Sequence, residues 1–196
     1  MNYAEVIEFV RKQIADNTGP TSYPFRDRFE HTMRVYRWAI KLQSQLGGDM
    51  EIIALAALLH SIRWEEGKDL GEISAEVAAN YLDGIGLEPE KIARIGEIIR
   101  IHSKRDVEMD LSVECKIVMD ADLLDEIGAV SVLWNSMGAA LDDDVDYRRA
   151  YNRVKSFYKE SRPKIRLCKT EAGRMEYNRR MKLLEDFLTQ LEKEVF

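Results

Sequence analysis

Residues 52–60 read IIALAALLH, an unbroken apolar run that ends in a histidine. Asp49 precedes this run by three positions and is a residue type that caps helix N-termini. A helix that is apolar on every side is normally buried within a core rather than laid on a surface. We therefore expect a helix over residues 50–62 at the centre of the fold, with its leucines among the most buried residues.

Helical periodicity continues on both sides of this central run, and no segment alternates as a strand. One further helix is expected at the N-terminus and ends at residue 16. The others cover residues 26–46, 74–84, 89–101, 112–127, 129–141, 147–159 and 170–195. Loops are expected at residues 17–24 and at the acidic turn DDDVD, residues 142–146. No linker divides the chain, so the sequence predicts an all-α, single-domain helical bundle over residues 1–196. Its core covers about residues 26–141, and the C-terminal helices, about 147–195, pack on it.

Composition excludes several classes of protein. The chain of 196 residues has 29 basic and 35 acidic side chains, a net charge of −6, which argues against binding a nucleic-acid polymer. Its longest apolar run, residues 52–59, is far shorter than the roughly 20 residues that span a bilayer, so we expect no membrane insertion. Cys115 and Cys168 are too few and too far apart for a disulfide framework, which favours a cytoplasmic protein.

The chain has only three histidines, and each lies near an end of an expected helix: His31, His60 and His102. A single histidine in such a place is more often a core residue bonded to a carbonyl oxygen. Burying three imidazoles costs several kcal/mol unless each has a partner. One shared metal ion or anion would serve all three.

Carboxylates that could join these histidines lie in the stretch MDADLLDE, residues 119–126. Asp122 flanks the inward face of the expected helix, where a carboxylate needs a cation or hydrogen-bond donors. Asp125 and Glu126 are explained by a solvated face or a helix cap. A calcium-binding loop is excluded, because the residues after Asp122 supply neither a further oxygen ligand nor a glycine.

Four stretches in this order resemble the HD-domain metal-dependent phosphohydrolases, in particular the small single-domain bacterial type. They are FEHTMRVYRWA (residues 29–39), AALLHSI (56–62), EIIRIHS (97–103) and KIVMDADLLDEIGA (116–129). The resemblance continues over residues 156–194 and so spans nearly the whole chain.

The resemblance implies a divalent metal ion, one of Mn, Ni, Co, Fe, Zn or Mg, held by His31, His60 and Asp122. Ser61 stands at a further ligand position, where the family has an aspartate. Serine is neutral and a weak donor to a hard cation, so one negative charge is lost from the ligand set. A second departure is Leu123, where relatives usually carry arginine.

The resemblance also implies metal-assisted hydrolysis of a small phosphorylated molecule, with nucleotides as the favoured class. Catalytic roles are expected for His102, for Asp120 as a reserve ligand or base, and for Arg34. Arg34 lies one turn after His31 and could reach a bound phosphate, although a surface arginine is an equally good interpretation. Three basic residues in the loops after His60 and His102 could attract anions, although each alone is better explained as solvated: Lys68, Lys104 and Arg105.

Two other functions stay open. One is a catalytically degenerate HD-like domain that binds a nucleotide or a protein partner, with Ser61 marking the lost metal site. The other is a helical adaptor, which would expose an apolar stripe on its last helix. The hydrolase instead predicts that five apolar residues of that helix are buried in the bundle: Leu183, Leu184, Phe187, Leu188 and Leu191.

Replacing Ser61 by aspartate distinguishes the hydrolase from the degenerate domain. In a working site, Ser61→Asp adds a carboxylate ligand, so calorimetric titration of Mn²⁺ or Ni²⁺ should show tighter binding than in the wild type. In the wild type, water, Asp120 or a loop carboxylate such as Glu65 or Glu66 must complete the metal site instead. In a degenerate site the same change buries an unpaired charge, and the variant would melt at a lower temperature without binding metal.

Overall fold

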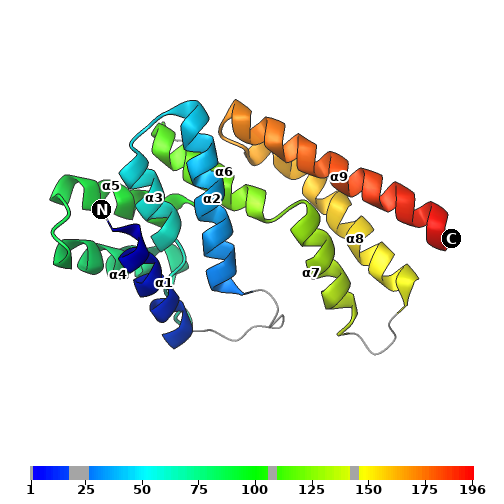
Figure 1. Ribbon diagram of the computed structural model, residues 1–196, viewed down its shortest axis with the longest axis horizontal. Coiled ribbons are helices and arrows are strands. Elements are labelled where there is room, and N and C mark those ends of the chain that lie inside the picture. Colours follow the sequence, from blue (N-terminus) through cyan, green and yellow to red (C-terminus); the bar gives the residue numbers. More distant parts are fainter. Residues whose placement is uncertain (1, 18–26, 106–109, 142–145) are drawn as a thin grey trace.

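The computed structural model describes residues 2–17, 27–105, 110–141 and 146–196, and over these ranges the fold is all-α, as predicted (Figure 1). The elements are α1 Tyr3–Asp16, α2 Arg28–Leu46, α3 Met50–Leu59, α4 Leu70–Gly84, α5 Pro89–Ile101, α6 Val113–Asp125, α7 Ala129–Ala139, α8 Tyr147–Ser161, the 3-10 helix η1 Arg162–Leu167 and α9 Glu171–Val195. Most of the predicted loop at 17–24 and most of the acidic turn, residues 142–145, lie outside the described residues.

Helix α3 is the centre of the bundle, as expected, but it ends at Leu59, three residues before the predicted end at residue 62. Every residue from Ile52 to Leu59 is buried, and α3 contacts α2, α5 and α6. The Asp49 carboxylate caps the helix by accepting from the backbone N–H groups of Glu51 and Ile52. Since the helix is apolar all round, only complete enclosure by its neighbours removes its surface from water.

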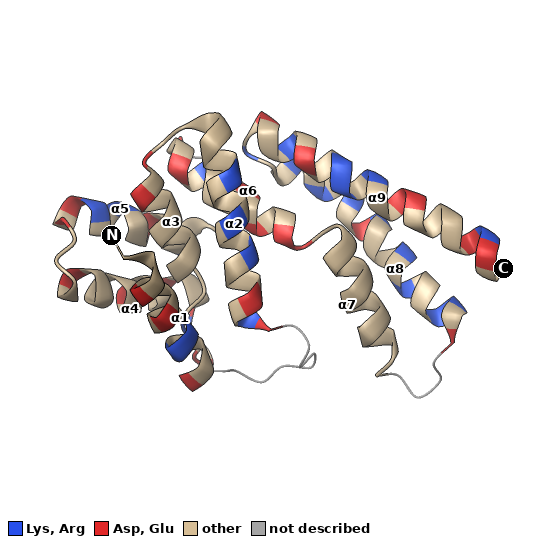
Figure 2. Cartoon of the chain, viewed as in Figure 1, with Lys and Arg blue, Asp and Glu red and all other residues tan. Residues whose placement is uncertain are grey.

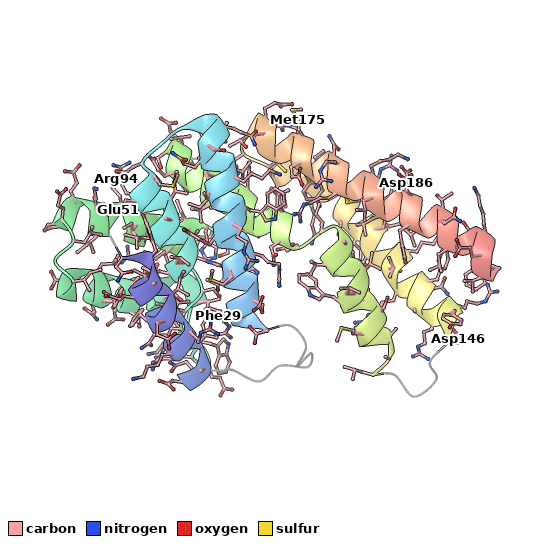
Figure 3. The ribbon with its side chains drawn as sticks, viewed as in Figure 1. Phe29, Glu51, Arg94, Asp146, Met175 and Asp186 are labelled. Carbon is pink, nitrogen blue, oxygen red and sulfur yellow. The ribbon has the colours of Figure 1, made fainter. Side chains whose placement is uncertain are left out.

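Helices α1, α4 and α5 close one side of α3. Phe9 on α1 stacks on Tyr81 of α4, and Phe29 lies at the start of α2 with the guanidinium of Arg11 4.0 Å from its ring centre (Figure 3). Helix α4 begins four residues before the predicted start at residue 74, because Asp69 caps it. Gly71 allows this early turn to pack closely against the carbonyl groups that end α5.

Helices α7 to α9 extend from this group of helices, and α9 runs from beside α2 and α6 to the C-terminus (Figure 1). Leu184 and Leu188 of α9 are buried, and Phe187 and Leu191 pack against them or their neighbours. The prediction for Leu183 is wrong: it is 39% exposed, because it lies about 100° around the helix from Leu184. The predicted division into a core and C-terminal helices of one domain stays a prediction.

Charge is distributed unevenly over the helices. Figure 2 shows α7 without a charged residue, whereas α9 carries charges of both signs along its exposed side. Among the described helices, none is both long and apolar enough to cross a membrane. Both cysteines are buried as free thiols, and the expected cytoplasmic location stays a prediction.

Truncating the central helix should be costly. Leu58 is fully buried on α3, so Leu58→Ala should lower the free energy of unfolding by about 2–5 kcal/mol, measured by urea denaturation. Leu183→Ala is the matched control and should change it by less than about 0.5 kcal/mol. Equal effects of the two substitutions would mean that α3 is not the core helix.

Candidate metal centre

The first site residue, His31, lies in the first turns of α2. Asp27 caps this helix by accepting from the N–H of Glu30, which fixes where the helix begins. His31 Nδ1 lies 2.8 Å from Oδ2 of Asp125 on α6. Because a carboxylate only accepts, Nδ1 must carry the hydrogen, and in the neutral ring Nε2 carries a lone pair.

His60 is the C-terminal cap of α3 and is almost completely buried. Its Nδ1 donates to the carbonyl oxygen of Ala57 at 2.7 Å, so its Nε2 is also an acceptor. Burial lowers the pKa of His60 to about 3, with the neighbouring His102 and His31 acting in the same direction. The ring is therefore neutral at physiological pH, which is the state that binds a metal ion.

Three acceptor atoms face one another at this point. His31 Nε2 lies 3.1 Å from His60 Nε2, and Oδ1 of Asp122 lies 3.4 Å from the first and 3.9 Å from the second. Lone pairs at these distances repel unless a cation or a proton lies between them. Two ligands at right angles with bonds of about 2.1 Å lie about 3.0 Å apart. Two imidazole nitrogens and one carboxylate oxygen therefore fit a divalent transition metal in both chemistry and spacing.

Asp122 is held by a cation on the side away from the histidines. Arg105, in the segment after α5, binds Oδ2 of Asp122 and also Glu126 at 3.1 Å. Burial alone would raise the pKa of Asp122, but Arg105 and the three histidines lower it to about 2. Its carboxylate is thus ionised, with Oδ1 left for the histidine side.

Asp125 is part of the site, and its interpretation as a solvated or capping residue is wrong. Its side chain is 2% exposed and accepts from His31 and, at 2.6 and 3.1 Å, from Arg34. Burial would raise the pKa of Asp125, but the hydrogen bonds from His31 and Arg34 lower it. The signal in the sequence was its spacing, one turn after Asp122 on the same face of α6.

The third histidine, His102, lies beside His60, so the three imidazole rings form a row. His102 ends α5, is buried, and donates from Nδ1 to the carbonyl of Ile99 at 2.7 Å. Its ring centre lies 5.0 Å from that of His60, which in turn lies 5.2 Å from that of His31. His102 is not among the residues that line the neighbouring cavity, and its catalytic role stays a prediction.

Asp120 lies elsewhere. Its carboxylate accepts from the backbone N–H groups of Lys169 and Thr170 at 2.7 and 2.8 Å, and from the Thr170 hydroxyl at 2.6 Å. A Cβ at Gly173 would collide with the same carboxylate. Asp120 therefore fastens the start of α9 to α6, and the structure does not bring it into the cluster of His31, His60 and Asp122.

The loop carboxylates and most of the predicted basic rim are also outside the cluster. Glu65 pairs with Arg63 and Lys68, so Lys68 is engaged by a carboxylate of its own loop. Lys104 is exposed, as a solvated lysine would be. Arg105 differs from the solvated side chain expected of it, because it is only 13% exposed and binds Asp122.

A cavity of about 290 Å³ opens beside the cluster. Its lining residues are Asp27, Arg28, His31, Arg34, Ser61, Asp125, Glu126 and Trp134. Trp134 comes from α7, and the guanidinium of Arg34 lies 5.8 Å from its ring centre. Sequence reasoning missed Trp134, because nothing in the chain order brings α7 opposite α2. The volume is at the lower end of the range for small-molecule sites.

Comparisons with known proteins agree with this geometry. Residues 28–127, just over half of the chain, match the model of the HD domain. The uncharacterized protein YpgQ of Bacillus subtilis is 28% identical over 171 residues, which cover 85% of this chain and 83% of YpgQ. An HD-superfamily hydrolase from Bacillus thuringiensis has a TM-score of 0.74 at 27% identity, covering 97% of this chain and 95% of its own. YpgQ in complex with ADP has a TM-score of 0.68 at 24% identity, covering 98% and 97%.

The metal-free protein should lose stability as the pH falls below 6.5. The native pKa of His60 is about 3 and its ordinary value is 6.5, so in this window the unfolded chain binds a proton that the native state does not. His60 should thereby lower the free energy of unfolding by about 1 kcal/mol between pH 6.5 and 5.5, and further down to about pH 3. Denaturation in EDTA measures this. The loss should be smaller in His60→Asn, and equal pH dependence in both proteins would contradict the assignment.

Proposed function

This chain belongs to the HD-domain family, and from that premise we propose that it is a metal-dependent phosphohydrolase acting on small phosphorylated molecules, with nucleotides as the substrate class. The observation that carries the proposal is the convergence of three acceptors: Nε2 of His31, Nε2 of His60 and Oδ1 of Asp122. A divalent cation held there supplies polarisation of a phosphoryl oxygen and activation of a water molecule.

The surrounding residues fix the direction of each acceptor. Asp125 holds the Nδ1 side of His31, and Arg34 holds Asp125 through two hydrogen bonds. Partners of this kind set the tautomer and the ring orientation of a ligating histidine. Arg105 binds one oxygen of Asp122 and so leaves the other for the cation.

The cavity supports a small phosphorylated substrate. It lies directly against His31, and two arginines, Arg28 and Arg34, are among its lining residues. Trp134 offers an aromatic surface on which a planar base could stack. The complex of Bacillus subtilis YpgQ with ADP supports the nucleotide as the substrate class.

Ser61 favours one rival function, a degenerate HD-like domain that binds a nucleotide or a protein without turnover. Ser61 takes the position where the family has a carboxylate ligand, so the cation is held by one charged group and two neutral ones. Fewer charged ligands weaken metal binding.

Metal binding and turnover test the proposal together. Calorimetric titration of Mn²⁺ should show one site in the wild type, and Asp122→Asn should weaken it about ten-fold or more, because the only carboxylate among the three acceptors is lost. The loaded protein should release phosphate or pyrophosphate from one or more nucleotides in a screen that also contains sugar phosphates. Mn²⁺, Ni²⁺, Co²⁺ and Mg²⁺ are compared in that screen.

The control is Asp186→Asn, which changes an exposed carboxylate on α9, labelled in Figure 3. Its metal affinity should equal that of the wild type. Metal binding without hydrolysis of any phosphorylated compound would favour the rival function, and equal affinities of Asp122→Asn and wild type would place the metal elsewhere.

A further inference from the structure

Ser61 has a hydroxyl group available to a ligand. It directly follows His60, its residue is 7% exposed, and it lines the cavity beside the metal centre. Within the part of the chain that the structure describes, the hydroxyl makes no hydrogen bond, unlike the buried hydroxyls of Thr32 and Thr170. Unlike the enclosed hydroxyl of Ser161, the Ser61 hydroxyl is open to the cavity, so an occupant of the cavity is its candidate partner.

The carboxylates that line the cavity already have donors of their own. Asp125 accepts from His31 and Arg34, and Asp27 accepts from the backbone at the start of α2. Glu126 pairs with Arg105 and with Lys164. Asp125 and Glu126 are therefore paired with cations before an anion enters the cavity, and Asp27 is hydrogen-bonded to the backbone.

The balance of charge at the metal centre also favours an anion. Asp122 contributes the only negative charge among the three acceptors, and Arg105 pairs with its second oxygen. A divalent cation there keeps a net positive charge. An aspartate at position 61 would lower that net charge by one, whereas serine is neutral and can donate a hydrogen bond to an oxyanion.

We propose that Ser61 is a substrate contact, and that its hydroxyl donates a hydrogen bond to a non-bridging phosphoryl oxygen of the ligand in this cavity. The inference rests on the proposed function and assigns a different role to the family's aspartate position in this chain. Ser61 binds the anion where an aspartate would bind the cation. With serine in place of aspartate, affinity for the metal ion is lower and affinity for the phosphoryl group is higher.

Inorganic phosphate is the probe. Calorimetric titration of phosphate into the Mn²⁺-loaded protein should show affinity that falls about ten-fold or more in Ser61→Ala and in the nearly isosteric Ser61→Cys, since a hydrogen bond to a charged group is lost. Ser61→Thr keeps the hydroxyl and should stay close to the wild type. Mn²⁺ affinity, titrated separately, should be unchanged in Ser61→Ala.

The matched control is Ser161→Ala. Ser161 is also a buried serine whose hydroxyl has no partner in the described structure, but it does not line the cavity. Its removal should leave phosphate affinity unchanged. Equal phosphate affinity in wild type and Ser61→Ala overturns the inference alone, as does a loss of Mn²⁺ affinity in Ser61→Ala, which would make Ser61 a metal ligand. Absence of Mn²⁺ binding by the wild type overturns the proposed function and, with it, this inference.

Discussion

The carboxylates on the buried helix α6 require cations or hydrogen-bond donors, and the arrangement of the other elements follows from how these are supplied. Asp120, Asp122 and Asp125 all lie on a helix whose surface is almost entirely covered. An unpaired buried charge costs several kcal/mol, so each of these side chains requires donors from a different part of the chain. The fold is therefore constrained to bring α2, the segment after α5, and the start of α9 to α6.

The three carboxylates have different roles, which follow from their positions along α6. Asp120 binds the backbone at the start of α9 and has a structural role. Asp125, five residues later, faces α2 and orients His31. Asp122, between them, faces the row of histidines and keeps one oxygen away from Arg105. Helix α6 thus carries the carboxylate that binds the start of α9, the carboxylate that is a candidate metal ligand, and the carboxylate that positions His31.

Sequence patterns predicted the helices well where apolar periodicity was strong, as in α3, and less well at ends set by a single cap. Asp69 starts α4 early, and no apolar pattern marks η1, which has no buried residue. The grouping of His31, His60 and Asp122 came from resemblance, because residues so far apart in the chain carry no distance information. Asp125 and Arg105 were misjudged since a charged residue on a helix or in a loop is usually solvated. Only the fold shows that Asp125 is buried against His31 and Arg34, and that Arg105 is largely covered and binds Asp122.

Lys169 has a consequence for the integrity of the whole molecule. Its backbone N–H binds Asp120, and its ammonium group binds the carbonyl oxygen of Arg105, whose side chain holds Asp122. One residue at the entrance of α9 thus tethers both the helix beneath it and the segment that orients the candidate ligand. A chain that ended before Lys169 would lose helix α9. It would also lose the hydrogen bond that holds the Arg105 segment at the cation site, although Lys169 lies 47 residues after Asp122 in the sequence. The geometry of the cation site therefore depends on the C-terminal helices, although these helices do not line it.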